Sequence, residues 1–533
     1  MHTKAVIPMA MIKTVKIVRS NCVLIEPVAM RIFSLSNLNM VWFYALKVQI
    51  LLCLLLLPSA FLFSVNLPIF AIHYIQMAQK PGIPKGTRDF SPTEVAKRQH
   101  IIQVIRSNFE KFGYQPIETP SFENSETLMG KYGEEGDRLI FKILNSGDYL
   151  SQADPLFLEA KDSVRLTSQI SEKALRYDLT VPFARYVVQH RNEIEFPFKR
   201  YQIQPVWRAD KPQRGRFREF FQCDADVVGA TSLWQEVELV QLYDSVFSEL
   251  GIKGVTIKIN NRKILSGIAE VIGAKDKLID FTVALDKLDK IGAEGVKKEM
   301  LIKGLDEAAI EKAAPLFNFT GNNQEKLAQL EKMLGASEEG KKGIAELQFI
   351  TEQIGNLGLG DSKLEIDVTL ARGLNYYTGA IFEVAPPNSI QLGSIGGGGR
   401  YDDLTGIFGM KDVSGVGISF GLDRIYLVVE ELNLFPDTAT SGPKAMFFNY
   451  GQNEALYALK AIKKLRSAGI KTEMYPENSK IAKQFQHAGR RFIPYAVITG
   501  EDEIKENKYA VKDLTTGEQL QLDFDEMLEF FSK

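Results

Sequence analysis

The chain has 533 residues, of which 45% are apolar and 24% are charged, and its formal net charge is −2. This length exceeds what one hydrophobic core supports, so we expect about three or four domains with the composition of an ordinary soluble protein. Residues 1–76 hold six basic side chains and one acidic side chain, which leaves a net charge of −7 on residues 77–533. An overall positive charge on residues 77–533 is therefore excluded, and any nucleic-acid binding must come from local basic patches.

Cysteine and histidine usage excludes two further classes of protein. Of the three cysteines, only Cys223 lies beyond residue 76, which argues against a disulfide framework and fits a reducing compartment. The histidines beyond residue 76 (His100, His190 and His487) are scattered along the chain. A structural zinc finger is therefore excluded as well.

Residues 1–76 form a hydrophobic extension. No charged residue occurs from Val48 to Ile72, a pattern typical of a transmembrane helix or an uncleaved signal anchor. Pro58 and Pro68 interrupt this run and make it a poor span. Met77 opens a segment typical of a cytosolic N-terminus. We therefore favour an upstream start that the cell does not use, with a targeting or membrane segment as the alternative.

Residues 77–259 begin with an amphipathic helix and a strand. Thr93–Phe112 has apolar residues at helical spacing, with Ser91 as the expected N-cap and Pro92 in the first turn. The strand-like segment Tyr114–Pro120 follows. Further along, Tyr201–Ala209 and Arg218–Val228 predict a hairpin around a polar, basic turn, and a loop of this length is typical of a functional loop.

The second half of the chain changes character three times. Residues 260–363 are rich in Lys and Glu and predict an inserted helical domain, whereas residues 364–440 return to glycine-rich strands. Residues 441–533 begin with a Ser-Gly-Pro linker and then alternate strand-like and helical segments. These segments are Ala445–Tyr450, Glu454–Ser467, Ile470–Met474, Ile481–Ala488 and Tyr495–Thr499, followed by a hairpin. This alternation predicts a small α/β domain with a mainly parallel or mixed sheet.

Arginines are the candidate phosphate ligands. The chain has no G-x-x-x-x-G-K-[ST] sequence, and Gly415–Gly421 departs from the dinucleotide fingerprint, so neither a P-loop nor a Rossmann site is expected. Arg208 ends a predicted strand, Arg372 precedes two tyrosines, and Arg424 follows a glycine-rich strand. A guanidinium stays charged and matches phosphate oxygens in pairs. Structural ion pairs are the alternative for each of them.

Acidic side chains lie near these arginines in the sequence. Asp178 follows Arg176-Tyr177, and Gln222, Asp224 and Asp226 share one face of a predicted strand because side chains alternate with a period of two. Such a face suits an ammonium group, a metal ion or an imidazole ring. A solvated strand face is the alternative.

Several segments together resemble histidyl-tRNA synthetases, a family of class II aminoacyl-tRNA synthetases. They are Gly86–Phe90, Arg176–Tyr186, the Arg208 hairpin, the loop Ala371–Tyr377 and Gly415–Arg424. The hairpin alone would indicate class II, and the Arg372 loop is peculiar to the histidine family. The similarity runs from about Met77 to the C-terminus and leaves out the extension.

The resemblance implies an α+β fold. A catalytic domain with an antiparallel sheet flanked by helices would occupy residues 77–259 and 364–440, with a helical insertion at 260–363 and an α/β anticodon-binding domain at 441–533. The implied enzyme ligates L-histidine to tRNA(His) through histidyl-adenylate, using ATP and Mg²⁺ and releasing pyrophosphate and AMP. A cytoplasmic homodimer is expected, with residues 93–120 at its interface and no membrane contact for residues 77–533.

The same resemblance implies the site residues. Arg208 and Arg372 would be catalytic and would hold the α-phosphate from two sides. The residues expected to bind histidine are Asp178, Thr180, Arg208, Gln222, Asp226, Arg372, Tyr376 and Tyr377. The residues expected to bind ATP are Arg208, Asp210, Arg216, Phe220, Gly417, Gly421 and Arg424. No resident metal ligand is expected. A carboxylate is nucleophilic at neutral pH, so the reaction requires no general base.

Two features qualify this interpretation. Asn375 stands where the family commonly has Asp, which puts any ionic role of that position in doubt. A histidine-sensing regulatory relative without catalysis is the competing hypothesis, but such relatives usually lose the arginines or the C-terminal domain. Here that domain carries a basic cluster expected to contact tRNA. Its members are Lys460, Lys463, Lys464, Arg466, Lys480, Lys483, Arg490 and Arg491.

Overall fold

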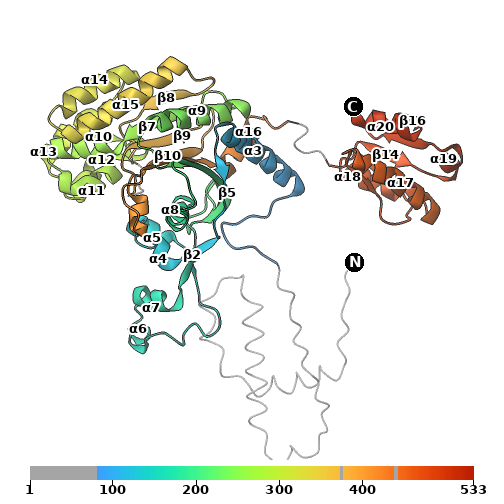
Figure 1. Ribbon diagram of the computed structural model, residues 1–533, viewed down its shortest axis with the longest axis horizontal. Coiled ribbons are helices and arrows are strands. Elements are labelled where there is room, and N and C mark those ends of the chain that lie inside the picture. Colours follow the sequence, from blue (N-terminus) through green and yellow to red (C-terminus); the bar gives the residue numbers. More distant parts are fainter. Residues whose placement is uncertain (1–80, 372–375, 437–441) are drawn as a thin grey trace, which may run out of the picture. The chain divides into compact units, whose positions relative to one another are not determined.

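The computed structural model describes residues 81–371, 376–436 and 442–533 (Figure 1). The interpretation of residues 1–76 falls outside these ranges. Within them, no helix combines the length and the apolar character that crossing a bilayer requires.

An eight-stranded sheet is the main element of residues 81–436. Its strands are mostly antiparallel, and only the two edge pairs, β1·β5 and β7·β8, are parallel. In spatial order the strands are β1 (Gln115–Pro116), β5 (Phe198–Trp207), β6 (Glu219–Val228), β11 (Gly415–Gly421), β10 (Gly396–Arg400), β9 (Ala380–Ala385), β7 (Thr256–Asn261) and β8 (Lys363–Ile366). The predicted antiparallel sheet and the predicted hairpin are confirmed.

Strand β1 is much shorter than predicted. The segment Tyr114–Pro120 was expected to be a strand throughout, but only Gln115 and Pro116 pair, with Arg200 and Tyr201 of β5. One more hydrogen bond, from the Ile117 amide to the Tyr201 carbonyl, extends this contact. Beyond it the Thr119 and Pro120 carbonyls accept hydrogen bonds from a side chain, so the ladder ends there.

Three helices pack against β6 and β11. They are α3 (Pro92–Lys111), α9 (Trp234–Glu249) and α16 (Leu422–Glu431). Ser91 caps α3 in a capping box with Glu94, and Pro92 fills its first turn, both as predicted. The apolar residues of β6 that face these helices (Cys223, Ala225 and Val227) are fully buried in the main core. The alternate residues of β6 consequently face the other way.

A smaller sheet and several short helices lie between β1 and β5 in the sequence. The sheet has the order β2 (Phe122–Asn124), β4 (Lys173–Leu175) and β3 (Lys142–Ile143). The helices are α4 (Ser125–Leu128), α5 (Gly133–Leu139), α6 (Pro155–Glu159), α7 (Ser163–Ile170) and α8 (Thr180–Gln189). A second apolar cluster, which includes Tyr132, Phe183 and Tyr401, holds α8 in place.

The predicted helical segment lies between the adjacent parallel strands β7 and β8. Its helices are α10 (Arg262–Ile272), η3 (Lys275–Lys277), α11 (Leu278–Leu285), α12 (Leu288–Ile302), α13 (Glu307–Ala313), η4 (Ala314–Asn318), α14 (Asn323–Leu334) and α15 (Glu338–Leu357). Their buried side chains belong to the same core as those of the main sheet. The 3-10 turn η5 (Leu404–Phe408) follows β10.

Residues 442–533 form an α/β unit around a mixed sheet. Its strand order is β13 (Thr472–Met474), β12 (Ala445–Phe447), β14 (Tyr495–Ile498), β15 (Tyr509–Asp513) and β16 (Gln519–Leu522). The first three are parallel and the last two antiparallel, as the alternating pattern predicted. The helices are α17 (Gln452–Ser467), α18 (Ile481–Arg490), α19 (Glu501–Glu506) and α20 (Phe524–Ser532). Two clusters of buried apolar side chains form its core.

Candidate active site

A cavity of about 360 Å³ lies on the face of the main sheet opposite α3, α9 and α16. Its walls come from the β5–β6 hairpin, the segment before α8, residues 376–377 and the glycine-rich strands β10 and β11. Every described residue of the predicted site lines it. These residues are Asp178, Thr180, Arg208, Asp210, Arg216, Phe220, Gln222, Asp226, Tyr376, Tyr377, Gly417, Gly421 and Arg424. Arg372 and Asn375 lie outside the described residues.

Strand β6 supplies an acidic floor. Gln222, Asp224 and Asp226 face the cavity, and the two carboxylates are each 2% exposed. Burial raises the pKa of Asp224 to about 7; Arg200 opposes this rise and Asp226 adds to it. Burial also raises the pKa of Asp226, against the effect of Arg200 and a hydrogen bond from Tyr401. The cavity therefore favours a positively charged ligand.

Asp178 is held by three donors. Its Oδ1 accepts hydrogen bonds from the Tyr132 hydroxyl at 2.9 Å and the Val181 amide at 3.2 Å. Its Oδ2 accepts one from the Tyr376 hydroxyl at 3.2 Å. Burial raises the pKa of Asp178 even so, while nearby Arg208 lowers it. Asp178 lies two residues before Thr180, the first residue of α8, so the helix start places both side chains at the cavity.

Arg208 projects into the cavity from the end of β5. Its Nε donates to the Tyr177 carbonyl at 3.0 Å, and its guanidinium stacks 4.2 Å above the Tyr177 ring. Phe220, across the hairpin, lies 5.3 Å from the same guanidinium. These contacts fix the plane of the guanidinium and leave its outer nitrogens toward the cavity.

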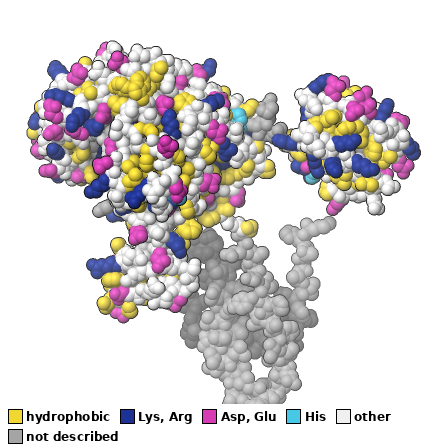
Figure 2. Space-filling model, viewed as in Figure 1, with side chains coloured by type: hydrophobic (Ala, Val, Ile, Leu, Met, Phe, Trp, Pro, Cys, Tyr) yellow, Lys and Arg dark blue, Asp and Glu magenta, His cyan; other side chains and the backbone are white. Residues whose placement is uncertain are grey.

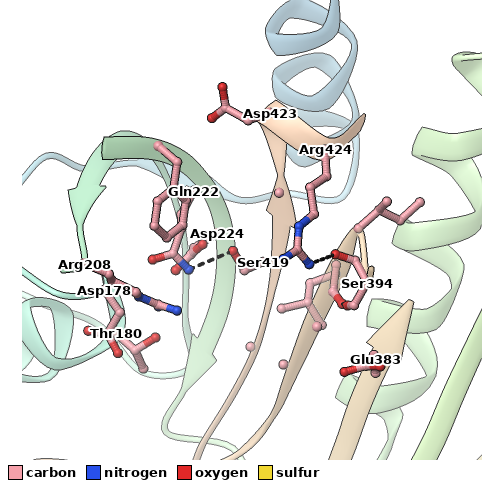
Figure 3. Close-up of a pocket in the computed structure, with 18 of the residues that line it drawn as sticks. Asp178, Thr180, Arg208, Gln222, Asp224, Glu383, Ser394, Ser419, Asp423 and Arg424 are labelled. Atoms are coloured by element: carbon pink, nitrogen blue, oxygen red, sulfur yellow. Dashed lines mark hydrogen bonds between the residues drawn. The ribbon is translucent and has the colours of Figure 1, made fainter. Parts of the chain in front are cut away.

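Two charged groups complete the opposite wall and the loop of the hairpin. Arg424, at the start of α16, donates to the Gly215 carbonyl at 2.9 Å and to the Ser394 carbonyl at 2.5 Å. Figure 3 shows Arg424 across the cavity from Arg208. Arg216 pairs with Asp210 at 2.8 Å within the hairpin loop. Two arginines therefore face one space from opposite sides, an arrangement suited to a chain of phosphates.

Glycines make room for this space. A Cβ on Gly417 would lie 1.9 Å from Oδ1 of Asp226, and one on Gly398 would lie 2.1 Å from the Gly417 carbonyl oxygen. No side chain fits at either position without moving the strand or the carboxylate. The glycine-rich composition of β10 and β11 thus keeps the cavity open next to its acidic floor.

The described residues hold no preformed metal site. No group of three or more His, Cys, Asp or Glu side chains among them has the geometry for a metal ion. Glu383 lines the cavity on the side of Arg424 and Ser394, as Figure 3 shows. A single carboxylate beside Arg424 can share a Mg²⁺ ion with other oxygen ligands, and it does not hold such an ion by itself.

Two family models match the chain. One, described as histidyl-tRNA synthetase, matches residues 86–152 and 158–425, and the other, described as an anticodon binding domain, matches residues 445–533. This chain belongs to the histidyl-tRNA synthetase family. The family match ends just beyond Arg424, so it covers all the described cavity residues.

Individual relatives agree with this membership. A protein of Flavobacterium johnsoniae named histidine–tRNA ligase is 68% identical over 467 residues, which cover 84% of this chain and 98% of that protein. One of Christiangramia forsetii with the same name is 69% identical over 449 residues, with the same coverage. The solved histidyl-tRNA synthetase of Nostoc sp. PCC 7120 shares 31% identity and a TM-score of 0.69, covering 85% of this chain and 98% of that one. The predicted α+β fold is thereby confirmed.

Three residues that hold the carboxylates of the cavity were not predicted from the sequence. Tyr132 and Tyr401 hold the carboxylates of Asp178 and Asp226, and Arg200 forms an ion pair with Asp226. Arg200 could have been found, because it lies directly opposite Asp226 once the hairpin register is set. Tyr132 carries no comparable signal, since it lies in a short segment between α4 and α5.

Proposed function

We propose that this chain catalyses the ATP-dependent ligation of L-histidine to tRNA(His), with histidyl-adenylate as the intermediate. The observation that carries the proposal is a cavity with an acidic floor between Arg208 and Arg424, in a chain of the histidyl-tRNA synthetase family. An acidic floor suits the α-ammonium group and the imidazole N–H of histidine, and the two arginines suit ATP.

The acidic side of the cavity would bind histidine. Asp178, Thr180 and Gln222 would receive the α-ammonium group, whereas Asp226, Tyr376 and Tyr377 would read the imidazole ring. Polar partners buried around a ring reject analogues that lack its N–H groups by about 10⁴-fold or more, so selectivity requires no editing site.

The arginines would hold ATP and the charge that develops during the reaction. Arg208 would bind the α-phosphate, with Arg372 on its other side, and Arg424 would bind the γ-phosphate end. Asp210, Arg216, Phe220, Gly417 and Gly421 would surround the remainder of the nucleotide. Mg²⁺ bound to the phosphates would add positive charge, and Glu383 is the carboxylate that would share it.

Positioning then carries the chemistry. A carboxylate oxygen of histidine attacks the α-phosphorus, the bond to the β-phosphate oxygen breaks, and pyrophosphate leaves. The Arg208 guanidinium neutralises the charge on the α-phosphoryl oxygens in the transition state. In the second step a hydroxyl of the terminal tRNA ribose attacks the activated carbonyl carbon and AMP leaves. The first step needs no protein base, since the carboxylate is already ionised. In the second step the hydroxyl gives up its proton as the ester bond forms and the bond to AMP breaks.

The α/β unit at residues 442–533 would contact tRNA through its basic cluster. Several members of that cluster also have partners within the unit: Arg466 donates to the Thr472 carbonyl, Arg491 pairs with Glu473, and Lys464 lies over Phe524. The exposed lysines among the others, such as Lys460 and Lys463, are the better candidates for phosphate contacts.

We also propose a cytoplasmic homodimer. Cys223, the one cysteine in the described residues, is free and buried, which suits a reducing compartment. Residues 93–120 would form the dimer interface. Sedimentation of the full chain at several concentrations tests whether the chain is a dimer. We also propose the domain boundaries that were predicted from the sequence.

Histidine-dependent exchange of pyrophosphate into ATP tests the activity. The full chain should exchange with histidine and not with the other amino acids, and a chain of residues 77–533 should do the same if the extension is dispensable. A folded protein that binds histidine without exchange would instead favour a histidine-sensing role.

A further inference from the structure

Three of the carboxylates that line the cavity, those of Asp178, Asp224 and Asp226, differ in how well the protein satisfies them. Both oxygens of Asp178 accept hydrogen bonds, from Tyr132, Val181 and Tyr376. Asp226 accepts a hydrogen bond from Tyr401 on Oδ1 at 2.6 Å. Its Oδ2 accepts no hydrogen bond from the described residues, but it lies 2.8 Å from the charged Nη2 of Arg200 in an ion pair. These two carboxylates are therefore largely engaged before any ligand binds.

Asp224 is different. Its carboxylate is hydrogen-bonded by the Ser419 hydroxyl, but its Oδ1 is buried and accepts no hydrogen bond from the described residues. Gln222, two residues earlier on the same strand face, also has a buried oxygen without a donor among those residues. The Gln222 amide nitrogen donates to Ser419 at 3.1 Å, which fixes the orientation of the side chain. Two neighbouring acceptors on the cavity floor thus lack donors.

The charges around the cavity floor also indicate that Asp224 lacks a partner. Arg200 is a fully buried cation beside the floor, and it forms its ion pair with Asp226. Arg208 stacks on Tyr177 at the cavity wall, where the proposed function assigns it to phosphate. Asp224 therefore forms no ion pair with a cation of the described residues; buried Arg176 acts on it only electrostatically. Leaving a buried acceptor and a buried charge unmatched is costly, so a site that keeps both is built for a ligand that supplies them.

An alkylammonium group meets both needs. It has three N–H donors and a full positive charge, and it can bond two acceptors on one strand face at once. Figure 3 shows Asp224 and Gln222 on the floor between Arg208 and Asp178 on one side and Ser419 on the other. We propose that Asp224 is a further histidine-binding residue, and that its carboxylate and the Gln222 oxygen receive the α-ammonium group of the substrate. This assignment rests on the proposed function.

A structural role for Asp224 makes a different prediction. Replacing a carboxylate that stabilises the fold lowers the stability of the protein. Replacing a carboxylate that is kept without donors for a ligand does not lower it. Asp244 offers the matched control, because it is also buried but accepts hydrogen bonds from the Gly360 and Ser362 amides at 2.7 and 3.0 Å. Asp244→Asn should lower the unfolding temperature and leave ligand preference unchanged.

The test uses three ligands and calorimetric titration of the full chain. Histidine and L-histidinol carry the ammonium group, and 3-(imidazol-4-yl)propionate carries the ring without it. In Asp224→Asn and Asp224→Ala, the dissociation constants of the first two should rise about 10- to 100-fold, and that of the third by less than about twofold, because one hydrogen bond to a charged group is lost. The unfolding temperature of the empty Asp224→Asn protein should equal or exceed that of the wild type.

Each other outcome has a definite meaning. Equal losses for all three ligands would overturn the ammonium assignment, since Asp224 would then act on the ring or on the fold. Unchanged binding of all three would overturn any ligand contact by Asp224. A wild-type chain without histidine-dependent exchange would overturn the proposed function instead, and the two failures are thereby distinguishable.

Discussion

Arg200 and Asp226 face each other across the β5–β6 hairpin with 2.8 Å between Nη2 and Oδ2, and neither side chain has more than 3% of its surface exposed. The Arg200 guanidinium also lies 4.2 Å from the centre of the Phe183 ring at the start of α8. The pair thus connects the acidic floor to the helix that begins beside Asp178. Arg200 stabilises the negative charge of Asp226 in the cavity. Without this partner the carboxylate would be protonated or would move out of the cavity.

Arg200→Met should destabilise the protein. The substitution keeps much of the side-chain volume but leaves Asp226 buried without a counter-charge, which costs about 3–5 kcal/mol of unfolding free energy. Urea unfolding followed by circular dichroism measures this loss. The double variant Arg200→Met, Asp226→Asn should recover part of it, because the uncompensated charge is then gone. A single variant as stable as the wild type would show that the pair contributes nothing to the fold.

Arg208→Gln should abolish most activity while the protein stays folded. Removing one preorganised group from a phosphoryl-type transition state costs about 10²–10³ in kcat, and the half-buried Arg208 has few structural contacts to lose. Arg214 is the control, because it lies in the same loop but points to Glu431 at an exposed ion pair. Arg214→Gln should change pyrophosphate exchange by less than about threefold. Equal effects of the two variants would contradict the role of Arg208.

Gly417→Ala should weaken histidine binding and lower stability together. A methyl group there would overlap the Asp226 carboxylate, so either the strand or the carboxylate must move, at a cost of about 1–3 kcal/mol. Gly355→Ala in α15 is the control, since its Cβ would have no heavy atom within 4 Å and alanine favours a helix. Thermal unfolding and the KM for histidine should therefore change in the first variant only.

Histidine binding should depend on pH through Asp224. Its neighbours are Arg200 on β5, Asp226 on β6, Ser419 on β11 and Asp178 before α8, and burial is the largest effect in raising its pKa to about 7. An ammonium group needs the ionised carboxylate, so the dissociation constant of histidine should rise about tenfold from pH 8 to pH 6. Asp224→Asn should remove this part of the dependence, and a variant with the wild-type profile would contradict it.

The stability of the empty protein should show the opposite trend with pH. A carboxyl group with a raised pKa favours the folded state while it is protonated, and this contribution is lost as the pH rises through about 7. The unfolding temperature of the wild type should therefore fall relative to that of Asp224→Asn between about pH 5 and pH 8. Parallel curves for the two proteins would contradict this.

Local patterns in the sequence predicted most of the elements. Helix α3 begins at its predicted cap because Ser91, Pro92 and Glu94 satisfy or remove the free amides of its first turn. Strand β6 shows its polar face at Gln222, Asp224 and Asp226 because alternation along a strand is a property of the backbone. The predicted length of the strand Tyr114–Pro120 was wrong because strand length depends on partners: the Thr119 and Pro120 carbonyls accept hydrogen bonds from the Arg176 side chain instead of from a neighbouring strand.

The sequence by itself therefore determined which residue types occur at which spacing: the arginines at the ends of strands, the carboxylates on one strand face and the glycines that leave room beside them. Only the tertiary structure decided which of these charges are already matched. Tyr132, Tyr401 and Arg200 come from three separate parts of the chain, and their hydrogen bonds and ion pair engage Asp178 and Asp226 but not the Oδ1 atom of Asp224. That difference arises from contacts between distant segments, which no local pattern encodes, because it depends on how strands and helices pack around the same buried space.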